Sequence, residues 1–225
     1  MPAANIGGWI RIGVWALPVY GVLTLWATLT QEPDRQNEVE AYARFLSTDI
    51  YLAHHLLGSI FGTILGIFGV IALAAYLANS RVGRLALLAM VLSVAGNCLI
   101  LTIFGFSTIV SPVIGQLYLA GQPGAMEVNE AIFSSAAFLI LVGPGLLLYL
   151  VGALLLGVAV WRSGTLPKWA GAIYAPSGFL LAAVFFGELR PIGSALIVIA
   201  GAWIAWTVTR QPSSQLGSGA QPRVQ

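Results

Sequence analysis

Apolar stretches long enough to cross a bilayer follow one another along almost the whole chain, separated by short polar segments. A hydrocarbon core of about 30 Å needs roughly 20 residues of helix, at about 1.5 Å per residue. The pattern therefore predicts six spans, at about residues 9–30, 51–79, 85–110, 131–160, 169–187 and 191–209. The predicted fold class is an all-α, polytopic membrane protein, a six-transmembrane-helix bundle forming a single domain over residues 1–209.

The polar segments between the spans carry patterns of their own. After the breaker sequence EPD, Val39, Tyr42 and Leu46 recur at spacings of three and four, which predicts a short interfacial helix leading into the second span. Residues 111–130 lack basic residues and hold two glycine-bearing turns, which predicts a loop that dips into the interface as a lid. Residues 210–225 are rich in Gly, Ser, Pro and Gln, which predicts a disordered tail.

The composition agrees with a membrane protein. Hydrophobic residues make up 58% of the chain and charged residues only 8%, whereas soluble domains carry roughly 25% charged residues. The single cysteine, Cys98, falls inside an apolar run, which excludes an intramolecular disulfide and a cysteine metal cluster.

The charged residues divide unevenly between the two sides that six spans would create. Seven of the ten basic residues fall on the side that holds both termini: Arg11, Arg81, Arg84, Arg162, Lys168, Arg210 and Arg223. The other three, Arg35, Arg44 and Arg190, fall on the opposite side with all eight acids. The positive-inside rule then predicts that both termini are cytoplasmic. Basic residues spread over four segments form no patch, so nucleic acid is excluded as a partner.

A glycine stripe follows the two histidines of the chain. The pattern GxxxGxxxG that starts at Gly58 is typical of a helix surface packed closely on another helix. At about 100° per residue, Tyr51 and His55 point within this stripe, whereas His54 lies toward its edge. We therefore expect His55 to face protein and His54 to face the interface.

The histidine pair admits several interpretations. The favoured one is an amphipathic pair near the membrane surface, hydrogen-bonded to a neighbouring loop. A first alternative is a zinc-type site built from His54, His55, Asp49 and Glu130, because imidazole and carboxylate are zinc ligands. Neighbouring helical residues diverge by about 100°, so His55 with acids from other helices is the more reasonable ligand set. Further alternatives are a haem with His55 as axial ligand and a proton-responsive role.

Two other places bring polar residues into or next to the membrane. Asn97 lies near the middle of the third span, where an amide usually makes an interhelical hydrogen bond that supports packing. Glu188 and Arg190 flank the last outer turn and would suit an anionic or zwitterionic ligand if the loop 111–130 covered them. Together with Tyr51 and His55, these three residues form the predicted ligand-binding set.

Prolines interrupt two successive spans. Pro144 lies between two glycines in the fourth span, and Pro176 lies in the fifth. A proline inside a helix removes a backbone hydrogen bond and clashes with the preceding turn, so a kink is expected at each. Two kinked helices in succession are equally compatible with a cavity between the helices and with a purely structural role.

Residues 163–180, SGTLPKWAGAIYAPSGFL, resemble a segment of uncharacterised bacterial six-span membrane proteins of unknown function. The shared feature is a short basic loop in which Leu-Pro-Lys/Arg-Trp-Ala-Gly opens a helix. The resemblance implies a bacterial inner (cytoplasmic) membrane protein and carries no activity with it.

These observations favour a small, non-enzymatic membrane protein that binds a lipid or apolar ligand between its helices, or serves as a subunit of a homo-oligomer or larger membrane complex. No cofactor is expected on this interpretation. The alternative is a membrane-embedded metal- or haem-binding enzyme with its site at the outer face around His55. A secondary transporter is a second alternative, although the spans lack the intramembrane charges typical of coupling.

Overall fold

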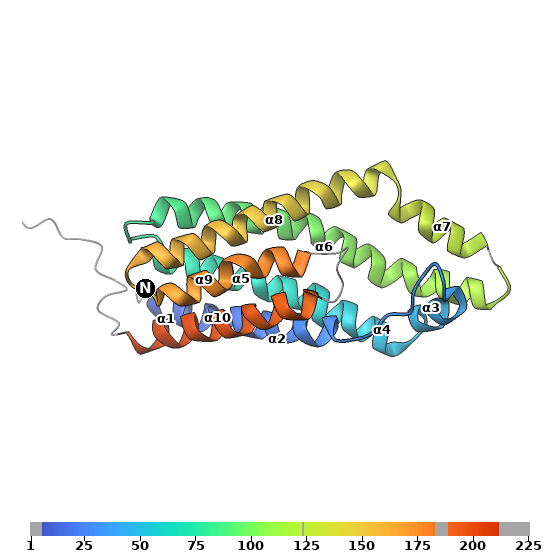
Figure 1. Cartoon of the computed structure of the whole chain (residues 1–225), viewed down its shortest axis with the longest axis horizontal. Coiled ribbons are helices and arrows are strands. Elements are labelled where there is room, and N and C mark those ends of the chain that lie inside the picture. The colour runs from blue at the N-terminus through green and yellow to red at the C-terminus, as the bar shows by residue number, and fades with distance from the viewer. Residues whose placement is uncertain (1–5, 123, 183–188, 212–225) are drawn as a thin grey trace, which may run out of the picture.

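The computed structural model describes residues 6–122, 124–182 and 189–211, and this part of the chain is all helical (Figure 1). Its elements are α1 (Ile6–Gly13), α2 (Ala16–Thr28), α3 (Val39–Leu46), α4 (Asp49–Ala53), the π-helix η1 (His54–Phe61), α5 (Gly62–Leu77), α6 (Gly83–Leu119), α7 (Gly124–Phe133), α8 (Ala136–Ser163), α9 (Lys168–Ala182) and α10 (Arg190–Arg210).

Within the residues that the structure describes, five helices are long and apolar enough to cross a membrane, which agrees with the predicted all-α, polytopic fold. They are Gly7–Thr28, Asp49–Leu77, Gly83–Leu119, Ala136–Ser163 and Arg190–Arg210. The predicted fifth span, 169–187, corresponds to α9 over its first part, and residues 183–187 lie outside the described residues, as do residues 212–225 of the predicted tail.

The helices form an elongated bundle whose two described chain ends lie at one end (Figure 1). There the Arg11 guanidinium donates a hydrogen bond to the backbone carbonyl of Gln211. The side chain of Gln211 accepts a hydrogen bond from the Tyr76 hydroxyl at 2.5 Å and donates one to the Thr165 carbonyl at 3.1 Å. Gln211 therefore ties the end of α10 to two other helices and to the turn before α9.

A proline explains the break between α1 and α2. Pro18 lacks the N–H that would bond to the carbonyl of Val14 and would clash with that turn. The chain responds with tighter i→i−3 bonds, from the Trp15 amide to the Ile12 carbonyl and from the Leu17 amide to the Val14 carbonyl, at 3.1 and 3.2 Å. Beyond this turn, α2 continues to Thr28.

A short helix is present after EPD as predicted, namely α3, and α4 follows it with Thr48 as its N-cap. The predicted lid at 111–130 is wrong. Helix α6 instead continues through Pro112 to Leu119, and α7 returns along it after a turn. The continuation is stabilised by packing on α3, since a Cβ added at Gly115 would lie 2.6 Å from the Ala43 carbonyl oxygen.

The predicted glycine stripe packs against α2, as expected. A Cβ added at Gly58 would lie 2.4 Å from the Cβ of Ala27, and one added at Gly66 would lie 3.0 Å from the Tyr20 ring. Close approach of the two backbones therefore requires these glycines.

The solid core occupies the half of the bundle that holds the chain ends. Its fully buried members include Leu17, Leu73, Leu77, Leu156 and Ile204. The opposite half contains a cavity lined by both polar and apolar side chains.

Candidate functional site

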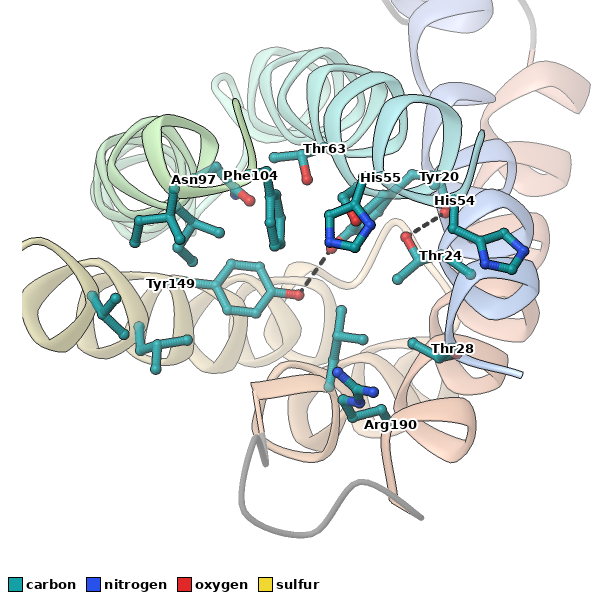
Figure 2. Close-up of a pocket in the computed structure, with 18 of the residues that line it drawn as sticks. Tyr20, Thr24, Thr28, His54, His55, Thr63, Asn97, Phe104, Tyr149 and Arg190 are labelled. Carbon is teal, nitrogen blue, oxygen red and sulfur yellow. Dashed lines mark hydrogen bonds between the residues drawn. The ribbon is translucent and has the colours of Figure 1, made fainter. Parts of the chain in front are cut away.

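A cavity of about 330 Å³ lies between α2, η1, α6, α8, α9 and α10 in the half of the bundle away from the chain ends (Figure 2). Cavities of roughly 300–1,000 Å³ are the usual size of small-molecule sites. Val142 and Leu146 of α8 line it and stand on either side of Pro144. Helix α8 runs through this proline without interruption.

The cavity has two different walls. Helices α6 and α8 supply an apolar wall, which consists of Ile100, Ile103, Phe104, Phe138, Val142 and Leu146. The facing helices α2, η1 and α5 supply polar side chains, which are Tyr20, Thr24, Thr28, His54, His55, Ser59 and Thr63. A molecule with one polar and one apolar part matches such a division.

Two buried tyrosines meet across the cavity (Figure 2). The hydroxyl oxygens of Tyr20 on α2 and Tyr149 on α8 lie 3.3 Å apart, and the two side chains are 6% and 8% exposed. The Thr24 hydroxyl, one turn further along α2, donates to the Tyr20 backbone carbonyl at 2.9 Å. Neither tyrosine was among the predicted site residues, because an isolated tyrosine in an apolar run is indistinguishable from a core residue.

His54 is buried, and the expectation that it faces the interface is wrong. Only 5% of the residue is exposed. Its Nε2 lies 2.9 Å from the Thr30 hydroxyl, and its ring meets the Trp26 ring edge-on with 4.4 Å between centroids. These contacts fix the imidazole against the end of α2.

His55 faces the cavity and is oriented by Tyr51. Its Nδ1 lies 3.2 Å from the Tyr51 backbone carbonyl, which can only accept, so Nδ1 carries the proton of this bond. The two rings are tilted by 31° with centroids 4.1 Å apart. The Tyr51 hydroxyl donates to the Ser107 carbonyl of α6 at 3.3 Å. Only Nε2 of His55 remains for a ligand.

The π-helix explains why the orientation of His54 differs from the sequence-based prediction. Residues His54–Phe61 form i→i+5 hydrogen bonds, so each residue turns less than in an α-helix. The rotation of about 100° per residue used for the prediction does not apply there, and His54 turns into the protein. Such segments are frequent at functional sites.

The other predicted ligand-binding residues fall as follows. Asn97 lines the cavity, is 6% exposed, and donates through Nδ2 to the Ser93 carbonyl of its own helix at 2.8 Å. Arg190 also lines the cavity from the first residue of α10. Glu188 lies outside the described residues. The structure thus places His55, Asn97 and Arg190 around one cavity, with Tyr51 behind His55.

The residues of the predicted metal site lie apart from one another. His54 and His55 line the cavity, Asp49 is exposed in the first turn of α4, and Glu130 of α7 lines a separate hollow with Arg35. Within residues 6–122, 124–182 and 189–211, no group of three or more His, Cys, Asp or Glu side chains lies close enough to hold a metal ion.

Comparison with known proteins identifies no ligand or activity for the cavity. No protein-family model, curated protein or solved structure matches the chain. The resemblance of residues 163–180 to bacterial six-span proteins therefore stays a prediction.

Proposed function

We propose that the protein binds a lipid or another apolar molecule in the cavity between its helices. The observation that carries the proposal is the cavity itself, about 330 Å³ in volume and lined on one side by six apolar side chains of α6 and α8. An apolar ligand would remove this wall from water, and each buried methylene contributes about 0.8 kcal/mol. No step of bond making or breaking belongs to this proposal.

We further propose that the chain crosses a bacterial inner membrane six times, with α9 in the fifth crossing and both termini in the cytoplasm. An even number of crossings agrees with the hydrogen bond from Arg11 to Gln211, which joins the two ends of the described chain. Lys168 supports a cytoplasmic turn before α9, because it lies over the Trp161 and Trp169 rings at 5.9 and 5.5 Å from their centroids. Basic residues are enriched in cytoplasmic loops, and tryptophan is enriched where a helix meets either membrane interface.

The direct test is a binding titration with an apolar probe. The purified protein in phosphatidylcholine nanodiscs would be titrated with a pyrene-labelled long-chain alcohol, with energy transfer from protein tryptophans as the signal. Empty nanodiscs give the background. We expect saturable binding, and an absence of saturation would contradict the proposal.

A matched pair of substitutions on α8 locates the binding. Val142→Phe adds volume at the cavity wall and is expected to weaken binding roughly tenfold. Ile140→Phe makes a comparable change at a residue that is 69% exposed on the outside of the same helix, and is expected to leave binding unchanged. Equal effects of the two variants would place the probe outside the cavity.

A further inference from the structure

Arg190 is a cation at the cavity that forms no ion pair with another residue the structure describes. It is the first residue of α10, and Figure 2 shows its guanidinium group pointing toward the space between His55 and Tyr149. Its Nε is buried and has no hydrogen-bond partner. Among the residues that the structure describes, the one salt bridge joins Arg44 to Glu40 within α3, so no carboxylate of that part of the chain forms an ion pair with Arg190.

The nearest acidic candidate does not fill this role. Glu32 is the acid that lines the cavity within the described part of the chain, and it is exposed to solvent. No ion pair joins Glu32 to Arg190, although the structure describes both residues. Within the described part of the chain, the charge of Arg190 is therefore left without a counter-charge.

The chemistry of the guanidinium indicates which group suits it as a counter-charge. Arginine stays charged at every physiological pH, and Arg190 is half-buried with its Nε out of contact with solvent, so a counter-charge beside it is favourable. Its planar fork of N–H donors matches the paired oxygens of a carboxylate or phosphate. The N-terminus of α10, a 21-residue helix without a side-chain cap, adds a partial positive charge at the same place.

We propose that the ligand of the cavity is an anionic single-chain amphiphile, whose carboxylate or phosphate head binds Arg190 and whose chain lies along the apolar wall of α6 and α8. This inference rests on the function proposed above and adds the class of ligand. His55 lies beside the head and offers Nε2 to it, since its Nδ1 is bound to the Tyr51 carbonyl. Tyr20 and Tyr149, whose hydroxyl groups already bind one another, lie beyond the head.

The test compares probes that differ only in the head group. Pyrene-labelled fatty acid, pyrene-labelled lysophosphatidate and the pyrene-labelled alcohol of equal chain length would be titrated into the protein in phosphatidylcholine nanodiscs. We expect at least one anionic probe to bind roughly tenfold more tightly than the alcohol. The stronger of the two anionic probes identifies the head as carboxylate or phosphate.

Substitutions of Arg190 attribute the preference to this side chain. Arg190→Gln is expected to lower the affinity for the anionic probe to that for the alcohol, while the affinity for the alcohol stays the same. Retained binding of the alcohol also shows that the variant is folded. Arg190→Lys keeps the charge without the fork and should retain part of the preference. Arg35→Gln, at an exposed position before α3, is the matched control and should change the affinity for neither probe.

The outcomes separate the two proposals. If the acid, the phosphate and the alcohol bind equally to the wild-type protein, the cavity binds apolar molecules, and the proposal that it selects an anionic head group is wrong. If the anionic preference survives in Arg190→Gln, Arg190 is not the site of the head. If none of the probes binds, the function proposed for the cavity fails and the inference fails with it.

Discussion

The hydroxyl oxygens of Tyr20 and Tyr149 lie 3.3 Å apart and connect α2 to α8 across the cavity. The two residues are separated by 129 positions in the chain, so this bond can form only after the bundle has assembled. Both residues are largely buried, so their two hydroxyl groups meet away from solvent. The pair therefore fixes the distance between the polar and apolar walls of the cavity.

Removing either hydroxyl should destabilise the bundle by a small, coupled amount. Tyr20→Phe and Tyr149→Phe each leave the other hydroxyl buried without its partner. Interhelical side-chain hydrogen bonds in membrane proteins contribute about 0.6 kcal/mol on average. We expect the double variant to lose less free energy of unfolding than the two single variants combined. Unfolding by dodecyl sulfate in mixed micelles, followed by circular dichroism, measures this, and strict additivity would show that the hydroxyls do not interact.

Gly96 should tolerate no side chain, because α6 and α8 touch there through their backbones. A Cβ at this position would lie 2.4 Å from the Tyr149 amide nitrogen and 2.7 Å from the Gly145 carbonyl oxygen. Gly96→Ala is expected to lower the free energy of unfolding by about 1–3 kcal/mol, the usual effect of overpacking. The same unfolding assay measures it.

Gly105 on the same helix is the control for that substitution. A Cβ there would have no atom within 4 Å. Gly105→Ala should therefore be neutral or stabilise the helix by up to about 1 kcal/mol, since alanine has the higher helix propensity. Similar losses of unfolding free energy at both positions would indicate that the close contact of α6 with α8 is not the reason why Gly96 tolerates no side chain.

The Asp34 carboxylate should titrate at unusually low pH. Its Oδ1 accepts hydrogen bonds from the backbone amides of Asn37 and Gln36, both at 2.8 Å, and these bonds lower its pKa. The turn is therefore stabilised above the ordinary aspartate pKa of about 3.9, and the stabilisation is lost as pH falls through the lowered value. Carbon-13 NMR of labelled aspartate carboxyl groups measures this, and Asp34→Asn identifies the signal. A pKa at or above the ordinary value would show that the Asp34 carboxylate does not accept these two hydrogen bonds in solution.

Local signals in the sequence predicted the parts of the fold that local interactions control. The spacing of Val39, Tyr42 and Leu46 predicted α3, and the apolar stretches predicted the five long helices to within a few residues at most ends. Residues 111–119 were misassigned because the helix there is supported by contact between Gly115 and Ala43, a tertiary interaction. A proline and a glycine in so short a segment normally indicate a loop, and packing overrides that tendency here.

The candidate site was only partly predictable for a similar reason. His55, Asn97 and Arg190 stand out as polar residues in or beside apolar runs, and all three line the cavity. The orientation of His54 could not be predicted, because the sequence pattern of residues 54–61 does not distinguish a π-helix from an α-helix. Tyr20 and Tyr149 acquire a shared role only through their contact in space.

The six-span arrangement predicts which side of the membrane each turn occupies. Cys98 is the one cysteine of the sequence and is exposed on α6, so a Cys98→Ser variant provides a cysteine-free background. Single cysteines would be placed in it at Gln36, Asn79, Thr165 and Ser213. We expect an impermeant maleimide to label position 36 in intact cells and the other three only after permeabilisation. Labelling of 165 and 213 on opposite sides would mean that α9 and α10 do not both cross. A fully reversed pattern would keep six crossings and overturn the cytoplasmic termini, so the number of spans and their direction are tested independently.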